Sequence, residues 1–292
     1  MVPTPPSITA NVLRFRETKS VRVLTKLIIQ IVRQQRTVEL IYGGYCTLWH
    51  RPSAVYPCDD EEALTRILSK KGEFIDHAPL SRGQLTALYG ENLPIHELPN
   101  DFACARRESV WLNDTCLILG EYGESARIAC ITARSCVISN YYRHVAGVRH
   151  IHSIQRYGDS GEFLVSTGDG RKFLDVWVAS RGEIRFVRRL RRRLAGFTAA
   201  VEVNGQYYFG SDFSSRPNFI ETLGGAKYFF PEKAYKLHVT AFHALFDRYI
   251  VSVNTELEVS GGRKTLSVFD TLKQRFVFCD YLDLTGTSGR VA

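Results

Sequence analysis

The fold is decided by the stretch from His150 to Ile220, which begins His150-Ile-His152-Ser-Ile154 and continues Phe163-Leu-Val-Ser-Thr-Gly-Asp169, Asp175-Val-Trp177 and Ile184-Arg-Phe186. A second segment of the same kind starts at Thr198 and reaches Tyr207-Tyr-Phe-Gly-Ser-Asp212. Each segment consists of an inner strand, a second strand that ends in Gly-Asp or Gly-Ser-Asp, and a hairpin. This is the pattern of one blade of a β-propeller.

Predicted outer hairpin turns recur along the chain, near residues 70, 134, 181, 224 and 272. The last four are about 43 to 48 residues apart, which is the period of a four-stranded blade. Asn204-Gly205, between two alternating strands, is a strong hairpin signal. The sequence therefore predicts an all-β protein with a single propeller of five four-stranded blades. A β-sandwich is the alternative, and the regular repeat argues against it.

The prediction divides the chain into a loose, Pro-rich segment 1–20 and one propeller domain over 21–292. The first predicted blade includes the stretch Leu64-Thr-Arg-Ile-Leu68 as a strand. The region near 76–105 is rich in Pro and Gly, and we expect an inserted loop with a short helix there. Residues 10–25 are expected to add a strand to the last blade and so to cover its edge.

Composition agrees with a β protein and limits the partners. Of the 292 residues, 45% are hydrophobic and 23% are charged, and the chain has fourteen Tyr and seventeen Phe. The net charge of +8 fits either an ordinary soluble surface or an anionic partner. No secretory signal and no apolar run long enough to span a membrane are seen, so a cytoplasmic protein is expected.

Cysteines and motifs exclude several classes of site. The seven cysteines show no CxxC spacing, which predicts reduced thiols and no zinc module. Cys130 and Cys136 flank a predicted turn and are expected to pack as thiols. The sequence has no P-loop, GxGxxG, GxSxG or HExxH motif. The basic run from Phe186 to Leu194 falls on an outer strand, where a solvated edge is expected and a polyanion-binding patch is the alternative. Nucleic acid is not predicted as a partner.

The segment from Asp175 to Phe186 resembles the sialidase-like, Asp-box propellers, whose signature Ser-x-Asp-x-Gly-x-Thr-Trp lies between the two outer strands. In frame with it stand Ala179, Arg181, Glu183, Arg185 and Phe186, and only the aromatic character of Phe186 matches. The resemblance covers residues 145–230 and implies the fold, with glycan-processing relatives. The Phe-Arg-Ile-Pro motif of sialidases is absent, so no catalytic residue is carried over.

In a propeller, the starts of the inner strands and the ends of the second strands open onto one face around the central channel. Residues from every predicted blade are therefore expected to meet at one mouth. They are Trp49, His50, Arg51, Glu121, Tyr122, Arg149, His150, His152, Asp169, Asp212, His238, His243, Asn254 and Glu256.

Three groups of these residues carry chemistry. His150 and His152 share one side of a strand and are candidate bases, or channel-wall residues. Asp169 and Asp212 are equivalent on adjacent blades and fit a hydrolytic carboxylate pair, or turn caps. Trp49, Tyr122 and Trp177 offer sugar platforms or core contacts, and Arg51 and Arg149 suit a carboxylate. No metal and no cofactor are predicted, since metal binding by the histidines would need a third ligand such as His243 or Asp169.

These observations predict a carbohydrate-active enzyme with His150, His152, Asp169 and Asp212 as catalytic residues. It would cleave an acidic saccharide as a glycosidase or a polysaccharide lyase, the latter with a His or Tyr base beside an Arg. A non-catalytic propeller that binds a protein or a glycan is the alternative. We further expect Asp169 to orient His152.

Overall fold

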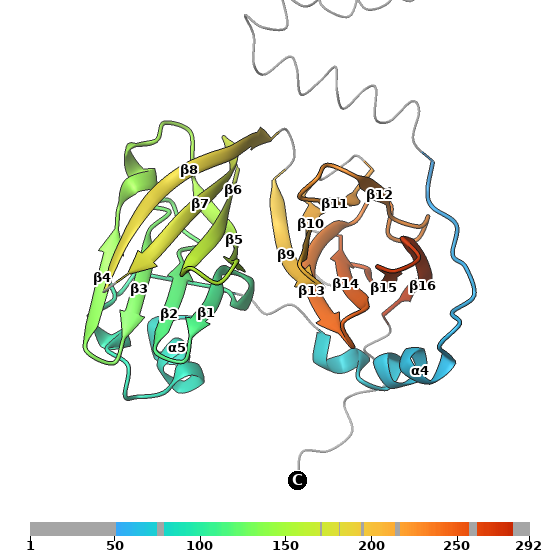
Figure 1. The fold of residues 1–292 in the computed structure, drawn as a ribbon, viewed down its shortest axis with the longest axis horizontal. Helices are drawn as coiled ribbons and strands as arrows, with labels where there is room; N and C mark the ends of the chain where they lie inside the picture. The colour runs from blue at the N-terminus through green and yellow to red at the C-terminus, as the bar shows by residue number, and fades with distance from the viewer. Residues whose placement is uncertain are drawn as a thin grey trace, which may run out of the picture. The chain divides into compact units, whose positions relative to one another are not determined.

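The computed structural model describes residues 51–74, 79–169, 171–180, 182–193, 196–213, 217–256 and 262–282. Their strands form four antiparallel sheets of four strands, and each sheet is built from consecutive strands. These sheets are the blades of a β-propeller (Figure 1). The predicted all-β propeller is therefore confirmed, whereas the predicted number of five blades is wrong, because the described residues form four.

The strands of the first two blades begin and end at regular intervals. The first blade contains β1 (Ser109–Asn113), β2 (Cys116–Gly120), β3 (Ile128–Thr132) and β4 (Ser135–Ser139). The second contains β5 (His150–Tyr157), β6 (Glu162–Gly168), β7 (Lys172–Ser180) and β8 (Glu183–Arg193).

The other two blades follow without a long insertion. The third contains β9 (Phe197–Val203), β10 (Gln206–Ser211), β11 (Phe219–Thr222) and β12 (Lys227–Phe229). The fourth contains β13 (His238–Leu245), β14 (Tyr249–Thr255), β15 (Lys264–Asp270) and β16 (Arg275–Tyr281). The turns near 134, 224 and 272 thus fall where the sequence predicts them, and the turn predicted near 181 lies between the described ends of β7 and β8.

The innermost strands β1, β5, β9 and β13 line the centre, and each contacts the next along the chain. Arg107, just before β1, donates an Nη1–H to the carbonyl of Thr240 on β13 at 3.2 Å, which joins the first blade to the last. The β9–β10 hairpin turns through Asn204 and Gly205, with φ of 51° and 75°. Two successive positive φ values are the geometry that favours Asn-Gly in a two-residue hairpin.

The blades pack face to face, so many strands are apolar on both sides. Ile118 and Ile128 of the first blade pack with Ile151 and Trp177 of the second. Equivalent apolar layers lie between the second and third blades and between the third and fourth. Because both faces of a blade are buried, short continuous apolar runs such as Leu117-Ile118-Leu119 occur in place of simple alternation.

Helical segments cover the outer faces of the first and last blades. Ile67 of α4 (Glu61–Ser69) and Phe74 of the 3₁₀ helix Lys71–Phe74 pack on the fourth blade. Leu85 of α5 (Arg82–Tyr89) and Ile95 of the 3₁₀ helix Ile95–Glu97 pack on the first blade. The short helix expected in the insertion is thus confirmed, and helices cover apolar faces that a further blade would otherwise bury.

The predicted strand Leu64–Leu68 is wrong, because these residues belong to α4. The Asp60 side chain accepts a hydrogen bond from the backbone N–H of Ala63 at 2.9 Å and caps the helix. Two acidic residues occupy the first turn, and the buried residues Ala63 and Ile67 are four positions apart. The spacing of buried residues is helical, so the predicted first blade is not formed here.

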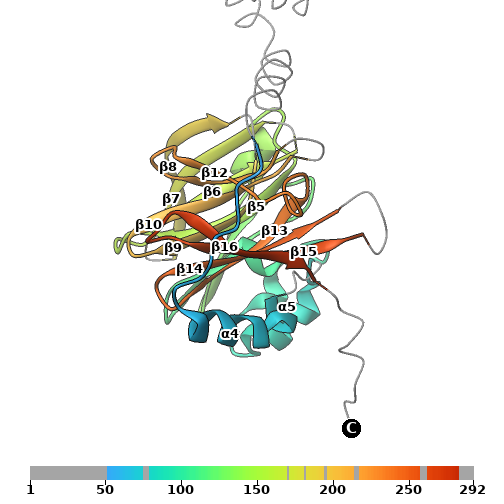
Figure 2. The same ribbon diagram turned by 90° about the vertical axis from the view of Figure 1, so that its right-hand side faces the viewer.

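The outer edge of the fourth blade is covered by the segment that precedes α4. Val55 forms a parallel bridge with Phe276 of β16, and the backbone N–H of Tyr56 donates to the Phe276 carbonyl at 2.9 Å. Figure 2 shows this blue segment running beside β16. Residues 1–50, with the strand expected at 10–25, lie outside the described residues. None of the described helices combines the length and the apolar run that a membrane span requires.

A buried polar network stabilises the second blade. Asp175 is fully buried and accepts two hydrogen bonds from Arg189, at 2.8 and 2.9 Å, and one from the Tyr142 hydroxyl at 2.9 Å. Trp177 Nε1–H donates to the same hydroxyl at 3.0 Å. Trp177 is therefore a core residue and not a sugar platform, and Arg189 of the basic run is held by a carboxylate rather than solvated.

The described cysteines are free thiols, as predicted. Cys130 lies opposite Val137 and Cys136 lies opposite Ile131 across the β3–β4 hairpin, so the two cysteines are offset. The Cys130 Sγ atom lies 3.4 Å from that of Cys116 on β2.

Candidate functional site

Three inner strands carry a β-bulge near their first residues. The pairing of β5 with β6 skips His152, that of β9 with β10 skips Thr198, and that of β13 with β14 skips Thr240. A bulge bends the strand and redirects the side chain of the extra residue. These three residues are thus equivalent positions of the blade repeat, and only the second blade places a histidine there.

His150 and His152 form an imidazole pair at the start of β5. Their Nε2 atoms are 2.7 Å apart and their ring centroids 4.6 Å apart. The His152 ring fits against Gly168, where an added Cβ would lie only 1.8 Å from its Nε2 atom. The glycine that ends β6 is therefore required for the position of this imidazole.

Asp212, just after β10, lies behind the imidazole pair. Its Oδ2 atom is 3.3 Å from His152 Nδ1 and 3.9 Å from Lys172 Nζ, and its Oδ1 atom is 3.4 Å from His238 Nδ1. The expected pairing of His152 with Asp169 is wrong, since Asp212 of the next blade takes this place. Asp169 instead has its Oδ2 atom 3.7 Å from His150 Nε2.

Burial sets the protonation of the cluster. Burial lowers the pKa of His152 to about 3, despite the opposing charge of Asp212. Burial also lowers the pKa of His150, against the charges of Asp169 and Asp212. Burial raises the pKa of Asp212, but His238, His152 and Lys172 outweigh this effect and hold its pKa below the usual value. Neutral imidazoles therefore stand beside an ionised, buried carboxylate.

Tyr122 and Asp169 form the exposed side of the cluster. The Tyr122 ring packs on His150, with centroids 4.4 Å apart, and the Arg107 guanidinium lies 5.6 Å from the Tyr122 ring centroid. The side chain of Asp169 is 58% exposed, against 12% for His150 and 4% for His152. The titratable groups thus form a row that begins at the buried Asp212, continues through His152 and His150, and ends at the exposed Asp169.

Several predicted site residues lie elsewhere. Glu121 is buried and ion-paired with Arg127, and its carbonyl accepts the Ile151 N–H at 3.1 Å, so it holds the first two blades together. Glu256 is ion-paired with Arg263 at 3.2 Å.

The remaining predicted residues do not join the imidazole pair. Arg149 is exposed next to His150, and its charge contributes to the lowered pKa of that histidine. Arg51 is exposed on the segment that precedes α4. Asn254 accepts a hydrogen bond from Ser252 at 2.8 Å, within β14. Trp49 and His50 lie outside the described residues.

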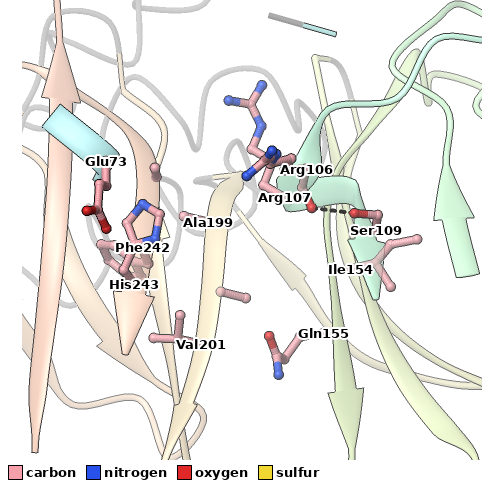
Figure 3. Close-up of a pocket in the computed structure, with 12 residues that line it drawn as sticks. Glu73, Arg106, Arg107, Ser109, Ile154, Gln155, Ala199, Val201, Phe242 and His243 are labelled. Carbon is pink, nitrogen blue, oxygen red and sulfur yellow. Dashed lines mark hydrogen bonds between the residues drawn. The ribbon is translucent and has the colours of Figure 1, made fainter. Parts of the chain in front are cut away.

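His243 lines a cavity of about 340 Å³ further along the inner strands. In Figure 3, Glu73, Phe242 and His243 lie on one side of this cavity, and Ser109, Ile154 and Gln155 lie on the other. Small residues of the third and fourth blades, Ala199, Ala200 and Ala241, leave the space open. Arg107 lines the cavity and also contacts Tyr122, so the cavity and the imidazole pair share one residue.

Sequence reasoning missed two cations of the site. Lys172 is the first residue of β7 and comes shortly after Asp169. Because it lies close in sequence to the end of β6, where site residues are expected, its position could have identified it as a site residue. Arg107 precedes β1 from within the 3₁₀ helix Arg106–Glu108, where the predicted insertion ends. No strand pattern marks that position.

The arrangement offers proton transfer, anion binding and metal ligation in one place. Neutral imidazoles are bases and ligands. Arg107 and Arg149 favour an anionic group beside Tyr122 and His150. His150, His152 and Asp169 also offer ligand atoms that all lie within 4.8 Å of one another.

Comparison with known proteins gives little further information. No protein-family model matches the sequence, and no curated protein matches it. Among solved structures, the chain is similar to one titled "Structure of Dos1 propeller", at 14% sequence identity and a TM-score of 0.40. The similarity covers 58% of this chain and 45% of that one, so it spans less than half of the solved chain's length.

Proposed function

We propose that this chain cleaves an acidic saccharide at the channel mouth, and that the cleavage is an elimination rather than a hydrolysis. The observation that carries the proposal is the row formed by Tyr122, His150 and His152, with Asp212 buried behind it. This row supplies a proton acceptor beside cationic side chains, which is what elimination next to a carboxylate requires.

Hydrolysis would need two carboxyl groups that face the substrate, one to protonate the leaving oxygen and one to attack or activate water. Asp212 is 10% exposed and lies between His152 and His238. Its pKa is held below the usual value, so it stays ionised and does not serve as a general acid. Asp169 is then left without a second carboxylate, which disfavours the glycosidase alternative.

Elimination suits the groups that are present. In a uronic acid, neutralisation of the carboxylate acidifies the adjacent C5–H bond. A base removes that proton, a C4=C5 double bond forms, the C4–O bond breaks, and the leaving oxygen takes up a proton. Tyr122 and His150, whose rings pack together, are the proton-transfer groups, and Arg107 and Arg149 neutralise the carboxylate.

The proposal is tested by incubation of the full chain with a panel of acidic oligosaccharides. Elimination yields an unsaturated product with ultraviolet absorbance, whereas hydrolysis yields only a new reducing end. We expect Tyr122→Phe and His150→Ala to lower turnover by about 10²-fold or more, the usual share of acid–base catalysis. Tyr281→Phe is the matched control, since Tyr281 is exposed on β16 of the fourth blade.

Other outcomes decide between the alternatives. A new reducing end without the unsaturated product would contradict elimination. Saturable saccharide binding that needs Tyr122, with no product of either kind, would instead show a non-catalytic glycan-binding module.

A further inference from the structure

Three ligand atoms converge where β5 begins and β6 ends. One ring nitrogen of His150, one of His152 and a carboxylate oxygen of Asp169 all lie within 4.8 Å of one another. His150 Nε2 is 2.7 Å from His152 Nε2 and 3.7 Å from Asp169 Oδ2. We propose that these three side chains bind one divalent first-row transition-metal ion.

The distances suit such an ion. Zinc takes nitrogen ligands at about 2.0–2.1 Å and carboxylate oxygens at about 2.0–2.2 Å, so neighbouring ligand atoms of a tetrahedral site are about 3.3 Å apart. The distance from His150 Nε2 to His152 Nε2, 2.7 Å, is below this value, and the distance from His150 Nε2 to Asp169 Oδ2, 3.7 Å, is above it. Because Asp169 is 58% exposed at the end of its strand, a small rotation of its side chain completes the site.

Asp212 supports the inference from the other side of the His152 ring. A metal-bound histidine usually directs its second ring nitrogen at a carboxylate, which fixes the ring and raises its basicity. His152 Nδ1 and Asp212 Oδ2 are 3.3 Å apart, and both atoms are buried without a hydrogen bond to any described residue. Nδ1 thus lies beside a carboxylate and Nε2 lies beside His150, the arrangement that a metal-bound histidine would have.

Two glycines leave room for this arrangement. A Cβ at Gly168 would lie 1.8 Å from His152 Nε2, and a Cβ at Gly196 would lie 2.8 Å from Asp212 Oδ2. Side chains at either position would displace the ligand or its supporting carboxylate.

The donor set indicates the class of metal. Two imidazoles and one carboxylate suit Zn²⁺, Mn²⁺, Fe²⁺ or Co²⁺, whereas Mg²⁺ and Ca²⁺ prefer oxygen ligands alone. Three protein ligands with an exposed Asp169 leave positions for water or substrate. The positive charges of Arg107 and Arg149 oppose a cation, and an anionic substrate group would offset them as a further ligand.

The use of this ion in catalysis rests on the proposed function, whereas its binding does not. With both Nε2 atoms bound to the ion, His150 and His152 would act as ligands, and Tyr122, whose pKa is raised by burial, would donate the proton to the leaving oxygen. The ion would neutralise the uronate carboxylate together with Arg107 and Arg149.

The test is calorimetric titration of the full chain, freed of metal with a chelator, with MnCl₂, CoCl₂ and ZnCl₂. The Co²⁺ form is also examined by visible absorption, which reports nitrogen ligation. We expect one site per chain. Asp169→Asn and His150→Ala should weaken binding at least tenfold, as Asp212→Asn should through His152. His144→Ala is the matched control, since His144 is an exposed histidine outside the cluster.

Asp169→Asn separates loss of binding from loss of folding. It replaces an exposed side chain by one of equal size, so we expect the fold to be retained. Absence of binding to the unmodified chain would overturn the proposal, as would equal affinities of the Asp169→Asn and His144→Ala variants. Metal binding without saccharide cleavage would reject the proposed function alone. Formation of the unsaturated product by chain that binds no metal would reject the metal site alone.

Discussion

Gly168 and His152 are in direct contact across the β5–β6 pair, with no space for a side chain between the β6 backbone and the imidazole. Gly168→Ala would place a methyl group 1.8 Å from His152 Nε2, so the ring must move. We expect metal and saccharide binding to weaken at least tenfold. Gly83→Ala in α5 is the control, since an added Cβ there meets nothing within 4 Å. Calorimetry on both variants checks the prediction, and unchanged affinity in Gly168→Ala would contradict the assigned role of His152.

Arg189→Met should destabilise the fold by about 3 kcal/mol or more, because it leaves the fully buried Asp175 carboxylate without its cationic partner. Arg188→Met, one residue earlier, should cost less than about 1 kcal/mol, since its Glu162 contact is 3.5 Å long and its side chain is 48% exposed. Urea denaturation measures both. Similar losses for the two variants would show that the buried pair has no special role.

Asp59 should make stability depend on pH. Hydrogen bonds from Lys273 and Arg248 lower the pKa of Asp59 to about 2, although its side chain is exposed. A lowered pKa in the folded state stabilises the fold above the unfolded value near 4, and this stabilisation is lost as pH falls through about 2. Asp59→Asn should therefore lower the melting temperature at pH 7 and have a much smaller effect near pH 2. The exposed Asp114→Asn should have no effect at either pH.

Thiol reactivity should differ between two cysteines of the first blade. Burial raises the pKa of Cys136 to about 11, whereas a hydrogen bond with Cys130 lowers the pKa of Cys116. Because the thiolate is the reactive form, Cys116 should be alkylated faster than Cys136 at pH 8. Peptide mass spectrometry over time gives the two rates, and faster labelling of Cys136 would be the contrary result.

The sequence predicts the blades well where a repeat is present. Strand ends of successive blades occupy equivalent places, so the meeting of His150, Asp212 and His238 at one mouth follows from the repeat alone. The choice of partners does not. Asp212 approaches His152 because a bulge redirects the His152 side chain and because the second and third blades lie side by side. The sequence of a single strand predicts neither of these features.

The number of blades was wrong for a different reason. The order of apolar and polar residues over 64–68 is compatible with a strand or with a helix. The helix forms because Asp60 caps it and because its first turn is acidic. Arg107 was not predicted as a site residue because it lies outside the blade repeat. The position of its segment depends on packing against the first blade.

Every described blade is one uninterrupted segment of the chain, with its strands in sequence order. Loop closure within a blade is therefore short, and a low contact order favours rapid formation. During synthesis each sheet can complete its hydrogen bonds before the next emerges, and the nascent chain needs no distant strand to finish a blade. The imidazole pair, in contrast, gains its supporting carboxylate only after the first two strands of the third blade have left the ribosome.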